Sequence, residues 1–414
     1  MIIIHGVAIL PRHVSAALAQ AAEVMPVIVV TGARQTGKST LVRDFGPADD
    51  RPYLTLDELD VLDQAISSPD DLVGRADRLT IDEVQRAPNV LLAVKRAVDG
   101  DRRRRPGRFL LTGSANLLVM KRVSESLAGR ATYLTLWPLT RREQLGLARP
   151  GLWDELLATP DAGWPDLLKS HRAPKEDWRD LARRGGYPVP ARNLKTAETR
   201  AIWFAGYTQT YLERDLSELS SVASLPDLRR LIRAVCLRLG QLVNQSELGR
   251  DVATPQATVH RWMNLLEVSY QLVRLPAYAV NRTKRLIKTP KLYWADTGLA
   301  MYLAGLPEPT GAHLENLVLA DLLTWRDARL DRPEVFYWRT SNGEEVDFVI
   351  ESGDTLLPIE VKIANKPRTG DAKHIRAFRE EYGRRSRSGL VLHTGDSIEW
   401  LAPGILACPW WRVV

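Results

Sequence analysis

The sequence predicts an α/β protein of several domains, and three observations lead to this prediction. Near the amino end, a run of β-branched residues passes directly into a glycine-rich loop and a helix, over residues 27–41. A second short apolar strand ends in two adjacent carboxylates, Asp82 and Glu83. Towards the carboxyl end, the pattern indicates a helix, three strands, another helix and a further strand. Strands that alternate with helices in this way are typical of sheets covered by helices.

Length and composition narrow the class of protein. A chain of 414 residues holds about two to four domains. The net charge of +7 and the pI of about 9.4 are compatible with a polyanionic partner. The two cysteines, Cys236 and Cys408, lie far apart and favour neither a disulfide framework nor a zinc site. No apolar run approaches the roughly 18–20 residues of a membrane span, and the amino end lacks a basic leader, so we expect a cytoplasmic protein without a membrane partner.

The glycine-rich loop predicts a nucleotide site. Val27–Val30 forms a buried strand, and Gly32–Ser39 then fits the phosphate-loop pattern G-x-x-x-x-G-K-S. Glycines let the backbone curl with its N–H groups turned inward, and the following helix adds partial positive charge. Lys38 is expected to reach the β- and γ-phosphates and Ser39 to ligate Mg²⁺. The residues expected to line the nucleotide are Gly32, Ala33, Arg34, Gln35, Thr36, Gly37, Lys38, Ser39 and Thr40.

Two further strands carry the groups that hydrolysis requires. Arg78–Glu83 fits the Walker B pattern, in which Asp82 holds Mg²⁺ through its water shell and Glu83 orients or deprotonates the attacking water. The strand Arg108–Thr112 is expected between the two Walker strands. Either Thr112 or Ser114 then contacts the γ-phosphate or the water, and the sequence does not choose between them.

The motifs GARQTGKST, TIDEVQRAP, LLTGSAN and SESLAGRATYLTLWPLT resemble, in this order, the AAA-type ATPase core of a large prokaryotic family. In that family the ATPase is joined to a C-terminal domain of unknown function. The resemblance implies ATP hydrolysis with Mg²⁺, a homo-oligomer, and a P-loop core over residues 1–145. It also implies that Arg130 reaches the γ-phosphate of a neighbouring subunit, whereas the alternative is an arginine that caps the end of a helix.

A helical lid or connector is predicted over residues 146–225. Prolines are frequent there, and tryptophans stand at 153, 164 and 178. The segment Arg183–Pro188 resembles the family's GG-x-P segment, in which Arg183 or Arg184 senses phosphate; a surface role is the alternative. Helical periodicity extends over Ala201–Leu219.

Residues 226–300 are predicted to form a winged helix. Helices are expected at Leu228–Leu239 and Asn244–Val252, followed by a third with Thr254 as its N-cap and Pro255 in its first turn. Strands near 268–279 and 286–295 form the wing, with the basic tip Asn281–Arg285. If the module binds DNA, the tip arginines meet phosphates, and the groove-facing residues are Thr258, His260 and Arg261. A protein–protein spacer is the alternative.

Residues 301–414 have the order helix, three strands, helix, strand, with Glu315, Asp347 and Glu360-Val361-Lys362 among them. Residues two apart on a strand share a face, so Glu360 and Lys362 point together. Asp347 on the adjacent strand lies beside Glu360 and completes an oxygen cage for a metal, with Glu315 as a further ligand. This pattern resembles the PD-(D/E)xK restriction-endonuclease superfamily, which implies that Lys362 positions the nucleophile or stabilises charge. Solvated surface pairs, or a domain kept only for binding, are the alternatives.

The leading hypothesis is therefore an ATP-hydrolysing protein that acts on DNA, by remodelling it or by ATP-gated, metal-dependent cleavage. Its cofactors are ATP and Mg²⁺, with a further Mg²⁺ or Mn²⁺ in the C-terminal domain. Two other classes stay open. One is a nucleotide-dependent switch or scaffold whose nuclease-like domain is silent, and the other is a winged-helix DNA-binding regulator.

Overall fold

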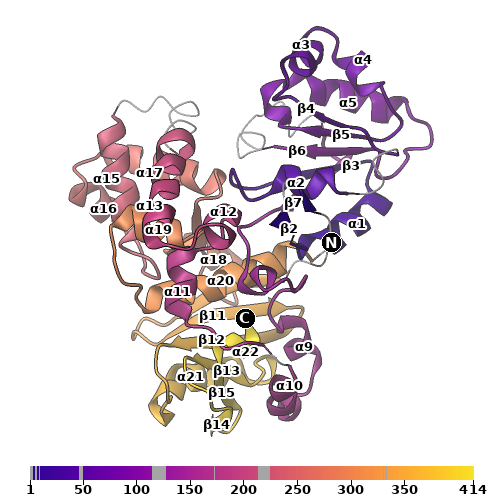
Figure 1. The fold of residues 1–414 in the computed structure, drawn as a ribbon. Coiled ribbons are helices and arrows are strands. Elements are labelled where there is room, and N and C mark those ends of the chain that lie inside the picture. Colours follow the sequence, from indigo (N-terminus) through magenta and orange to yellow (C-terminus); the bar gives the residue numbers. More distant parts are fainter. Residues whose placement is uncertain are drawn as a thin grey trace.

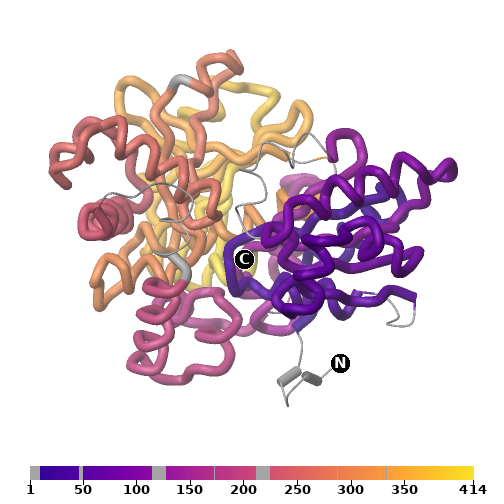
Figure 2. Tube along the Cα trace, turned by 90° about the horizontal axis from the view of Figure 1, so that it is seen from above, coloured from indigo at the N-terminus to yellow at the C-terminus, as the bar shows by residue number. Residues whose placement is uncertain are grey.

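The computed structural model describes residues 3–4, 7–8, 10–45, 50–113, 127–171, 173–212, 224–329, 331 and 333–414. The amino-terminal domain (residues 10–136) forms a lobe of its own, and the remaining chain forms a second, larger lobe beside it (Figures 1 and 2). Before the first lobe, β1 (Ile3–Ile4) and β2 (Val7–Ala8) pair antiparallel. No helix in the described part of the chain combines the length and apolar character that a membrane crossing needs.

The amino-terminal domain is a parallel five-stranded sheet in the order β4-β5-β6-β3-β7. Its β6 lies between β3 and β5, as the motifs predicted. The strands are β3 (Val27–Thr31), β4 (Tyr53–Thr55), β5 (Leu79–Asp82), β6 (Phe109–Thr112) and β7 (Ala131–Thr135). The helices are α1 (Val14–Val24), α2 (Lys38–Arg43), α3 (Leu59–Ser67), α4 (Pro69–Val73) and α5 (Asn89–Gly100).

Strand β3 shows why this sheet is buried on both faces. Val27 and Val29 pack in one core with α3, α4 and α5, whereas Ile28 and Val30 pack in another with α1 and α2. Successive side chains of a strand point to opposite faces, so a strand covered on both sides must be apolar throughout. The continuous run of β-branched residues is therefore a direct consequence of the fold.

The connector (residues 137–212) packs against the C-terminal half of the chain. Its tryptophans at 153, 164 and 178 are buried in one core with the C-terminal sheet. The predicted helix Ala201–Leu219 is observed as α13 and a π-helical turn, and residues 213–219 lie outside the described residues. The helices are α8 (Arg141–Gln144), α9 (Trp153–Ala158), α10 (Trp164–Ser170), α11 (Trp178–Arg184), α12 (Pro188–Arg192), α13 (Ala197–Tyr207) and the π-turn η3 (Thr208–Leu212).

The middle domain (residues 224–304) has the three helices and the antiparallel β8–β9 pair that the sequence suggested. Its elements are α15 (Leu225–Cys236), α16 (Gln245–Asp251), α17 (Gln256–Val268), β8 (Leu272–Leu275), α18 (Arg282–Ile287), β9 (Lys291–Trp294) and α19 (Thr297–Ala304).

Three details of the predicted winged helix are wrong. The segment after Asn281 is the helix α18, because the Asn281 side chain accepts the N–H groups of Thr283 and Lys284 as an N-cap. Pro255, rather than Thr254, holds the cap position of α17. Arg285 is unavailable for phosphates, because its guanidinium is buried against the Glu351 carboxylate at 2.6 and 3.1 Å.

The C-terminal domain (residues 310–414) contains all six predicted elements in their predicted order, followed by β14, β15 and α22. Its sheet has the order β10-β11-β12-β13-β15-β14, with β10, β11 and β12 antiparallel and β12, β13 and β15 parallel. The elements are α20 (Gly311–Asp327), β10 (Glu334–Arg339), β11 (Glu345–Ser352), β12 (Thr355–Lys362), α21 (Lys373–Tyr382), β13 (Gly389–His393), β14 (Glu399–Ala402), β15 (Ile405–Pro409) and α22 (Trp410–Val413).

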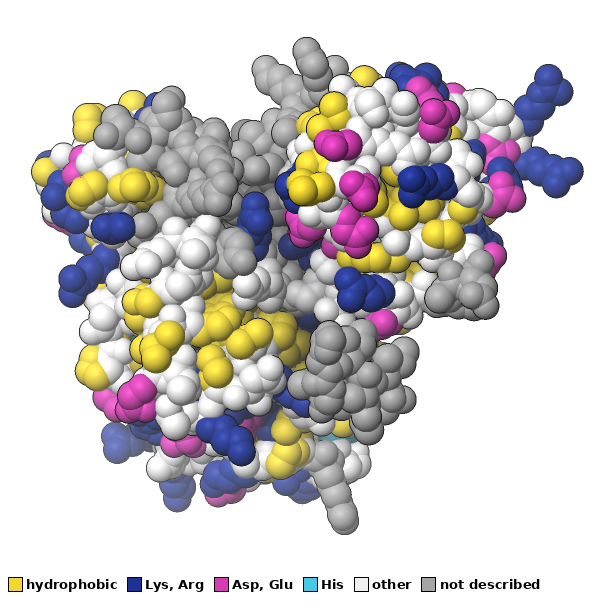
Figure 3. Space-filling view, turned by 45° about the horizontal axis from the view of Figure 1, so that its top comes forward, with side chains coloured by type: hydrophobic (Ala, Val, Ile, Leu, Met, Phe, Trp, Pro, Cys, Tyr) yellow, Lys and Arg dark blue, Asp and Glu magenta, His cyan; other side chains and the backbone are white. Residues whose placement is uncertain are grey.

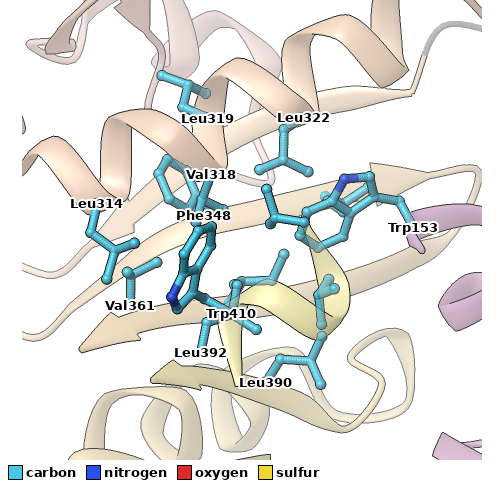
Figure 4. Close-up of a cluster of buried hydrophobic side chains, with 14 of the residues drawn as sticks. Trp153, Leu314, Val318, Leu319, Leu322, Phe348, Val361, Leu390, Leu392 and Trp410 are labelled. Atoms are coloured by element: carbon cyan, nitrogen blue, oxygen red, sulfur yellow. The ribbon is translucent and has the colours of Figure 1, made fainter. Parts of the chain in front are cut away.

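A core of large side chains joins this sheet to the preceding domains. Helix α20 covers one face of the sheet, where Val318 and Phe348 pack together with Trp153 of the connector and Trp410 of α22 (Figure 4). Leu275 of the middle domain belongs to the same core. The connector, part of the middle domain and the C-terminal domain are therefore held together by shared apolar packing.

Candidate nucleotide site and C-terminal carboxylate cluster

Two glycines shape the loop after β3. Gly32 has φ +140°, and a Cβ at this position would overlap the carbonyl oxygen of Leu136. Gly37 has φ +97° and holds the cap position of α2. Only glycine adopts these backbone angles at little cost, so both positions of the motif are required by the geometry. The loop thereby ends with backbone N–H groups at the start of a helix, where anions bind favourably.

Lys38 lies within the loop. Its side chain is 4% exposed, and its ammonium donates to the carbonyl oxygens of Gly32 at 3.1 Å and Ala33 at 2.8 Å. The buried Thr36 hydroxyl donates to the same Ala33 carbonyl at 3.0 Å. Ser39 follows Lys38 in α2 and is half-buried. Arg34, Gln35 and Thr40 complete the predicted set; Gln35 and Thr40 are exposed, and Gln35 has φ +60°.

Arg12 stabilises this loop through hydrogen bonds, and the sequence pattern did not predict this role. The guanidinium donates to the Thr36 carbonyl at 2.8 Å, to the Trp137 carbonyl at 2.6 Å and to the Glu143 carboxylate at 3.1 Å. Arg12 and Glu143 are both buried, which makes this ion pair sensitive to the loss of either partner. Glu143 lies 131 residues along the chain, so no local motif could have indicated the pair.

Thr112 joins the two Walker B residues. Its hydroxyl donates to Asp82 and accepts the Glu83 backbone N–H at 3.1 Å. Glu83 has φ +59°, a left-handed conformation that is uncommon for a residue other than glycine and is often found at functional sites. Thr112 pairs with Val30 of β3, so these groups lie beside the strand that leads into the loop. Ser114, the other candidate, lies outside the described residues.

Asp82 is buried at 2% exposure and also accepts a hydrogen bond of 2.6 Å from the Tyr53 hydroxyl. Burial, together with the bond to Asp82 and its negative charge, raises the pKa of Tyr53 to about 12, so this hydroxyl remains a donor. Together with the Ser39 hydroxyl, Asp82 supplies the hard oxygen donors that Mg²⁺ prefers. The residues present therefore fit a magnesium-bound nucleotide.

Two tyrosines connect the loop region to the second lobe. The Tyr270 hydroxyl donates to the Thr31 hydroxyl at 2.9 Å, at the point where β3 ends. The Tyr207 hydroxyl donates to the Arg34 carbonyl at 3.5 Å and accepts from the Gln271 amide at 3.0 Å. These contacts were not predicted, because Tyr207 lies in a helical pattern and Tyr270 in a predicted wing strand, where a tyrosine indicates ordinary core packing.

The predicted arginine sensors have partners within the chain. Arg130 binds both oxygens of Asp99, at 2.6 and 2.9 Å. Arg183 pairs with Asp180 and Glu308, and Arg184 pairs with Glu176. The roles of these arginines in nucleotide sensing stay predictions, and any such role for Arg130 requires that its pair with Asp99 breaks.

The C-terminal domain brings its predicted residues together. Glu360 is 3% exposed and accepts from the Lys362 ammonium at 2.6 Å, while Asp347 accepts the Val361 N–H at 2.9 Å. Glu315 accepts from the Tyr293 hydroxyl at 3.0 Å. Burial raises the pKa of Glu315 and of Glu360 to about 8, and the negative charge of Asp347 adds to both shifts.

A lysine also enters this cluster, and the sequence did not suggest it. The Lys291 ammonium lies 3.3 Å from Asp347 Oδ1 and 2.5 Å from Glu345 Oε1. Among the described residues, no group of three or more His, Cys, Asp or Glu side chains is arranged to hold a metal ion. The predicted carboxylates therefore lie together. The ammonium of Lys291 lies beside Asp347, where the sequence predicted oxygen ligands around a metal.

In the middle domain, the three residues predicted to face DNA differ in availability. Thr258 is half-buried, and the exposed His260 ring lies 3.1 Å from Gln245 Oε1 and 3.0 Å from Asn264 Nδ2. Arg261 is exposed, as are Arg282 and Lys284 on α18.

Comparison with known proteins identifies relatives along most of the chain. A family model described as an AAA domain matches residues 25–145, and two described as domains of unknown function match residues 175–310 and 310–413. An uncharacterized protein of Mycobacterium tuberculosis is 31% identical over 366 residues, or 86% of this chain and 74% of that protein; one from Mycobacterium bovis gives the same values.

More distant relatives are also found. An uncharacterized protein of Haemophilus influenzae is 22% identical over 281 residues, or 66% of this chain and 64% of that protein. Among solved structures, a Walker-type ATPase of Pyrococcus abyssi is 16% identical and has a TM-score of 0.42, with 72% of this chain and 99% of that chain covered.

Proposed function

Because this chain belongs to the same family as these mycobacterial proteins and carries an AAA-type ATPase domain, we propose that it hydrolyses ATP and uses the turnover to change how its second lobe engages DNA. One observation carries the hydrolytic part. The Thr112 hydroxyl contacts both the Asp82 carboxylate and the Glu83 N–H, and so holds these two residues beside the strand that leads into the phosphate loop.

Each residue of the site has a distinct task in this proposal. The loop N–H groups and Lys38 bind the phosphates, and Glu83 orients the attacking water. Ser39 and Asp82 would hold Mg²⁺, which would supply positive charge to the bound phosphates. The Glu83 N–H is bound to Thr112, and the Gln85 side chain donates to the Glu83 carboxylate, so these two contacts hold Glu83 in place.

The hydrolytic part is tested with two variants. Lys38→Ala removes the ammonium that neutralises the phosphates and should abolish ATP binding. Glu83→Gln keeps the shape of the side chain but not its basicity, so it should bind ATP and fail to turn it over. Binding is measured by titration with a fluorescent ATP analogue and turnover by phosphate release. Turnover of Glu83→Gln at the rate of the unmodified chain would refute the role of Glu83.

Three features support DNA as the partner. The chain carries a net charge of +7. Helices α16 and α17 follow one another as in a helix-turn-helix, and Arg261, Arg282 and Lys284 of this domain are exposed. On the face of the amino-terminal domain seen in Figure 3, acidic and basic side chains are interspersed. Exposed basic groups attract a phosphate backbone, so the middle domain is a candidate for this contact.

DNA-dependent ATPase measurements test this part. Turnover should rise with duplex or single-stranded DNA, and the apparent affinity should fall steeply with salt. Arg282→Ala should weaken DNA binding and reduce the salt slope by about 1. Arg96→Ala is the matched control, because Arg96 is also exposed but pairs with Asp70 on the amino-terminal domain. Turnover indifferent to DNA at every salt concentration would exclude this partner.

A second candidate function is a nucleotide-dependent switch whose nuclease-like domain cuts nothing. The position of Lys291 beside Asp347 favours it, because an ammonium there opposes a second cation. Incubation of plasmid DNA with Mg²⁺ or Mn²⁺ separates the two functions. Nicks that disappear in Asp347→Ala and Lys362→Ala would indicate cleavage, and an intact plasmid under all metal and nucleotide conditions supports the silent domain.

A further inference from the structure

Lys291 crosses from one domain into the charged cluster of another. It is the first residue of β9 in the middle domain and is 2% exposed. Its ammonium contacts Glu345 Oε1 at 2.5 Å and Asp347 Oδ1 at 3.3 Å, both on β11 of the C-terminal domain, and lies 5.9 Å from the Tyr337 ring centre. A buried ammonium is stable only when opposite charges surround it, so these contacts are a condition of the fold.

The surroundings hold Lys291 in this place. The Tyr278 N–H donates to the Tyr337 carbonyl at 2.6 Å, and the Asn316 side chain donates to the Trp294 carbonyl at 2.7 Å. Each of these bonds joins the middle domain to the C-terminal domain, as does the buried pair of Arg285 and Glu351 described above. The chain is therefore held to the C-terminal domain both before and after Lys291.

The carboxylates do not fit a divalent cation in this arrangement. Oxygen ligands of Mg²⁺ or Ca²⁺ lie about 2.0–2.6 Å from the ion. Both oxygens of Asp347 are engaged, one by the Val361 N–H and one by Lys291. Glu360 Oε2 is buried and has no hydrogen-bond partner within the described part of the chain, whereas Glu360 Oε1 accepts from Lys362. The Lys291 ammonium, 3.3 Å from Asp347 Oδ1, opposes a further cation at this carboxylate.

We propose that the Lys291 ammonium takes the cation position of the C-terminal carboxylate cluster, so that the cluster serves as an ionic anchor between the domains instead of a metal site. The inference deepens the second candidate function, on which it rests. It explains how four buried or half-buried carboxylates, Glu315, Glu345, Asp347 and Glu360, can lie together: Lys291 and Lys362 supply the positive charge from the chain itself.

Manganese binding tests the proposal on the full chain. The uptake of Mn²⁺ is measured by the loss of the free-ion electron paramagnetic resonance signal, without nucleotide, so that the phosphate loop does not contribute. The unmodified chain should take up no Mn²⁺ that depends on Asp347. Lys291→Met, which keeps most of the volume and removes the charge, should gain about one equivalent per chain, and Lys291→Met with Asp347→Asn should lose it again.

Thermal unfolding provides the second measurement and covers a Lys291→Met chain that does not fold. The double variant Lys291→Met/Asp347→Asn removes both charges, so it should unfold at a higher temperature than Lys291→Met alone. A double variant that is folded where the single is not supports the anchor equally. A double variant less stable than the single, or Asp347-dependent Mn²⁺ uptake by the unmodified chain, would overturn the proposal.

Measuring ATP turnover in parallel distinguishes a failure of the ionic anchor from a failure of the proposed function. Neither the Mn²⁺ titration nor the unfolding comparison depends on DNA or on nucleotide. A failed anchor with normal DNA-stimulated turnover therefore rejects only the role of Lys291. Plasmid nicking by the unmodified chain would reject the silent-domain function. A chain that neither binds metal nor nicks DNA supports both the ionic anchor and the silent-domain function.

Discussion

Thr112→Val removes one hydroxyl and leaves the shape of the side chain nearly unchanged. The lost hydroxyl donates to the Asp82 carboxylate and accepts the Glu83 N–H. A hydrogen bond to a charged group contributes about 1.5–3 kcal/mol and one between neutral groups about 0.5–1.5 kcal/mol, so the expected loss of unfolding free energy is about 2–4 kcal/mol. Thr112 is fully buried, so solvent cannot replace either contact in the folded chain.

The same substitution should slow hydrolysis. Glu83 keeps its left-handed backbone while its N–H is bound to Thr112, and without that bond the carboxylate loses a restraint on its direction. A loss of about 1.4–2.7 kcal/mol in the transition state corresponds to about a ten- to hundredfold lower kcat. Phosphate release under saturating ATP gives kcat, and urea unfolding gives the stability.

Thr80→Val is the matched control. Thr80 lies on the neighbouring strand β5, is 1% exposed, and its hydroxyl has no hydrogen-bond partner among the described residues. Removing an unsatisfied buried hydroxyl should leave stability unchanged or raise it, with normal turnover. If Thr112→Val and Thr80→Val behaved alike in both assays, the bridging role of Thr112 would be refuted.

Three further predictions address other parts of the molecule. If Arg130 acts on a neighbouring subunit, Arg130→Ala should lower kcat about 10³-fold or more. Asp99→Ala releases Arg130 from its ion pair and should not lower kcat. Equal kcat for both variants argues for the capping role. Burial raises the pKa of Asp321 from 3.8 to about 6, so its stabilising contribution is complete below about pH 4 and is lost as the pH rises through 6. Asp321→Asn should remove this dependence, which is about 2 kcal/mol in urea unfolding between pH 4 and 7. An unchanged dependence of stability on pH in this variant would contradict the prediction. Gly32→Ala should weaken ATP binding about 5- to 150-fold, because backbone strain and overlap with Leu136 cost about 1–3 kcal/mol. An unaltered affinity for ATP would show that the loop adapts to the added methyl group.

The sequence predicted those features whose signals are local. The phosphate loop, the Walker B carboxylates and the position of β6 follow from motifs and from strands of continuous apolar character. The six elements of the C-terminal domain follow from strand and helix periodicity. Helix α18, in contrast, was predicted to be the tip of a hairpin, although Asn281 caps its first turn.

The contacts that the sequence did not predict join residues far apart in the chain. Arg12 meets Glu143, Tyr270 meets Thr31, and Lys291 meets Asp347 across separate domains. Each is an ordinary residue in its own local pattern, and only the packing of whole domains brings the pairs together. Local sequence patterns therefore could not predict the site residues whose partners lie far along the chain.

The shared core determines which parts of the molecule can move against each other. Leu275 on β8 and Tyr293 on β9 pack in one core with the C-terminal sheet, and Lys291 adds its buried ion pairs there. Neither core of the amino-terminal domain's sheet contains residues of β8 or β9. The middle and C-terminal domains thus form one body, and the amino-terminal domain forms another (Figure 2).

The nucleotide loop touches the second body through few polar contacts. The Tyr270 hydroxyl reaches Thr31, and Tyr270 stands shortly before β8, which pairs with β9 at Leu275 and Lys291. A change at the end of β3 therefore acts on a strand pair that is already anchored in the C-terminal domain. Because a buried ion pair and a packed core resist gradual deformation, we expect ATP turnover to move this body as a unit rather than to open the carboxylate cluster.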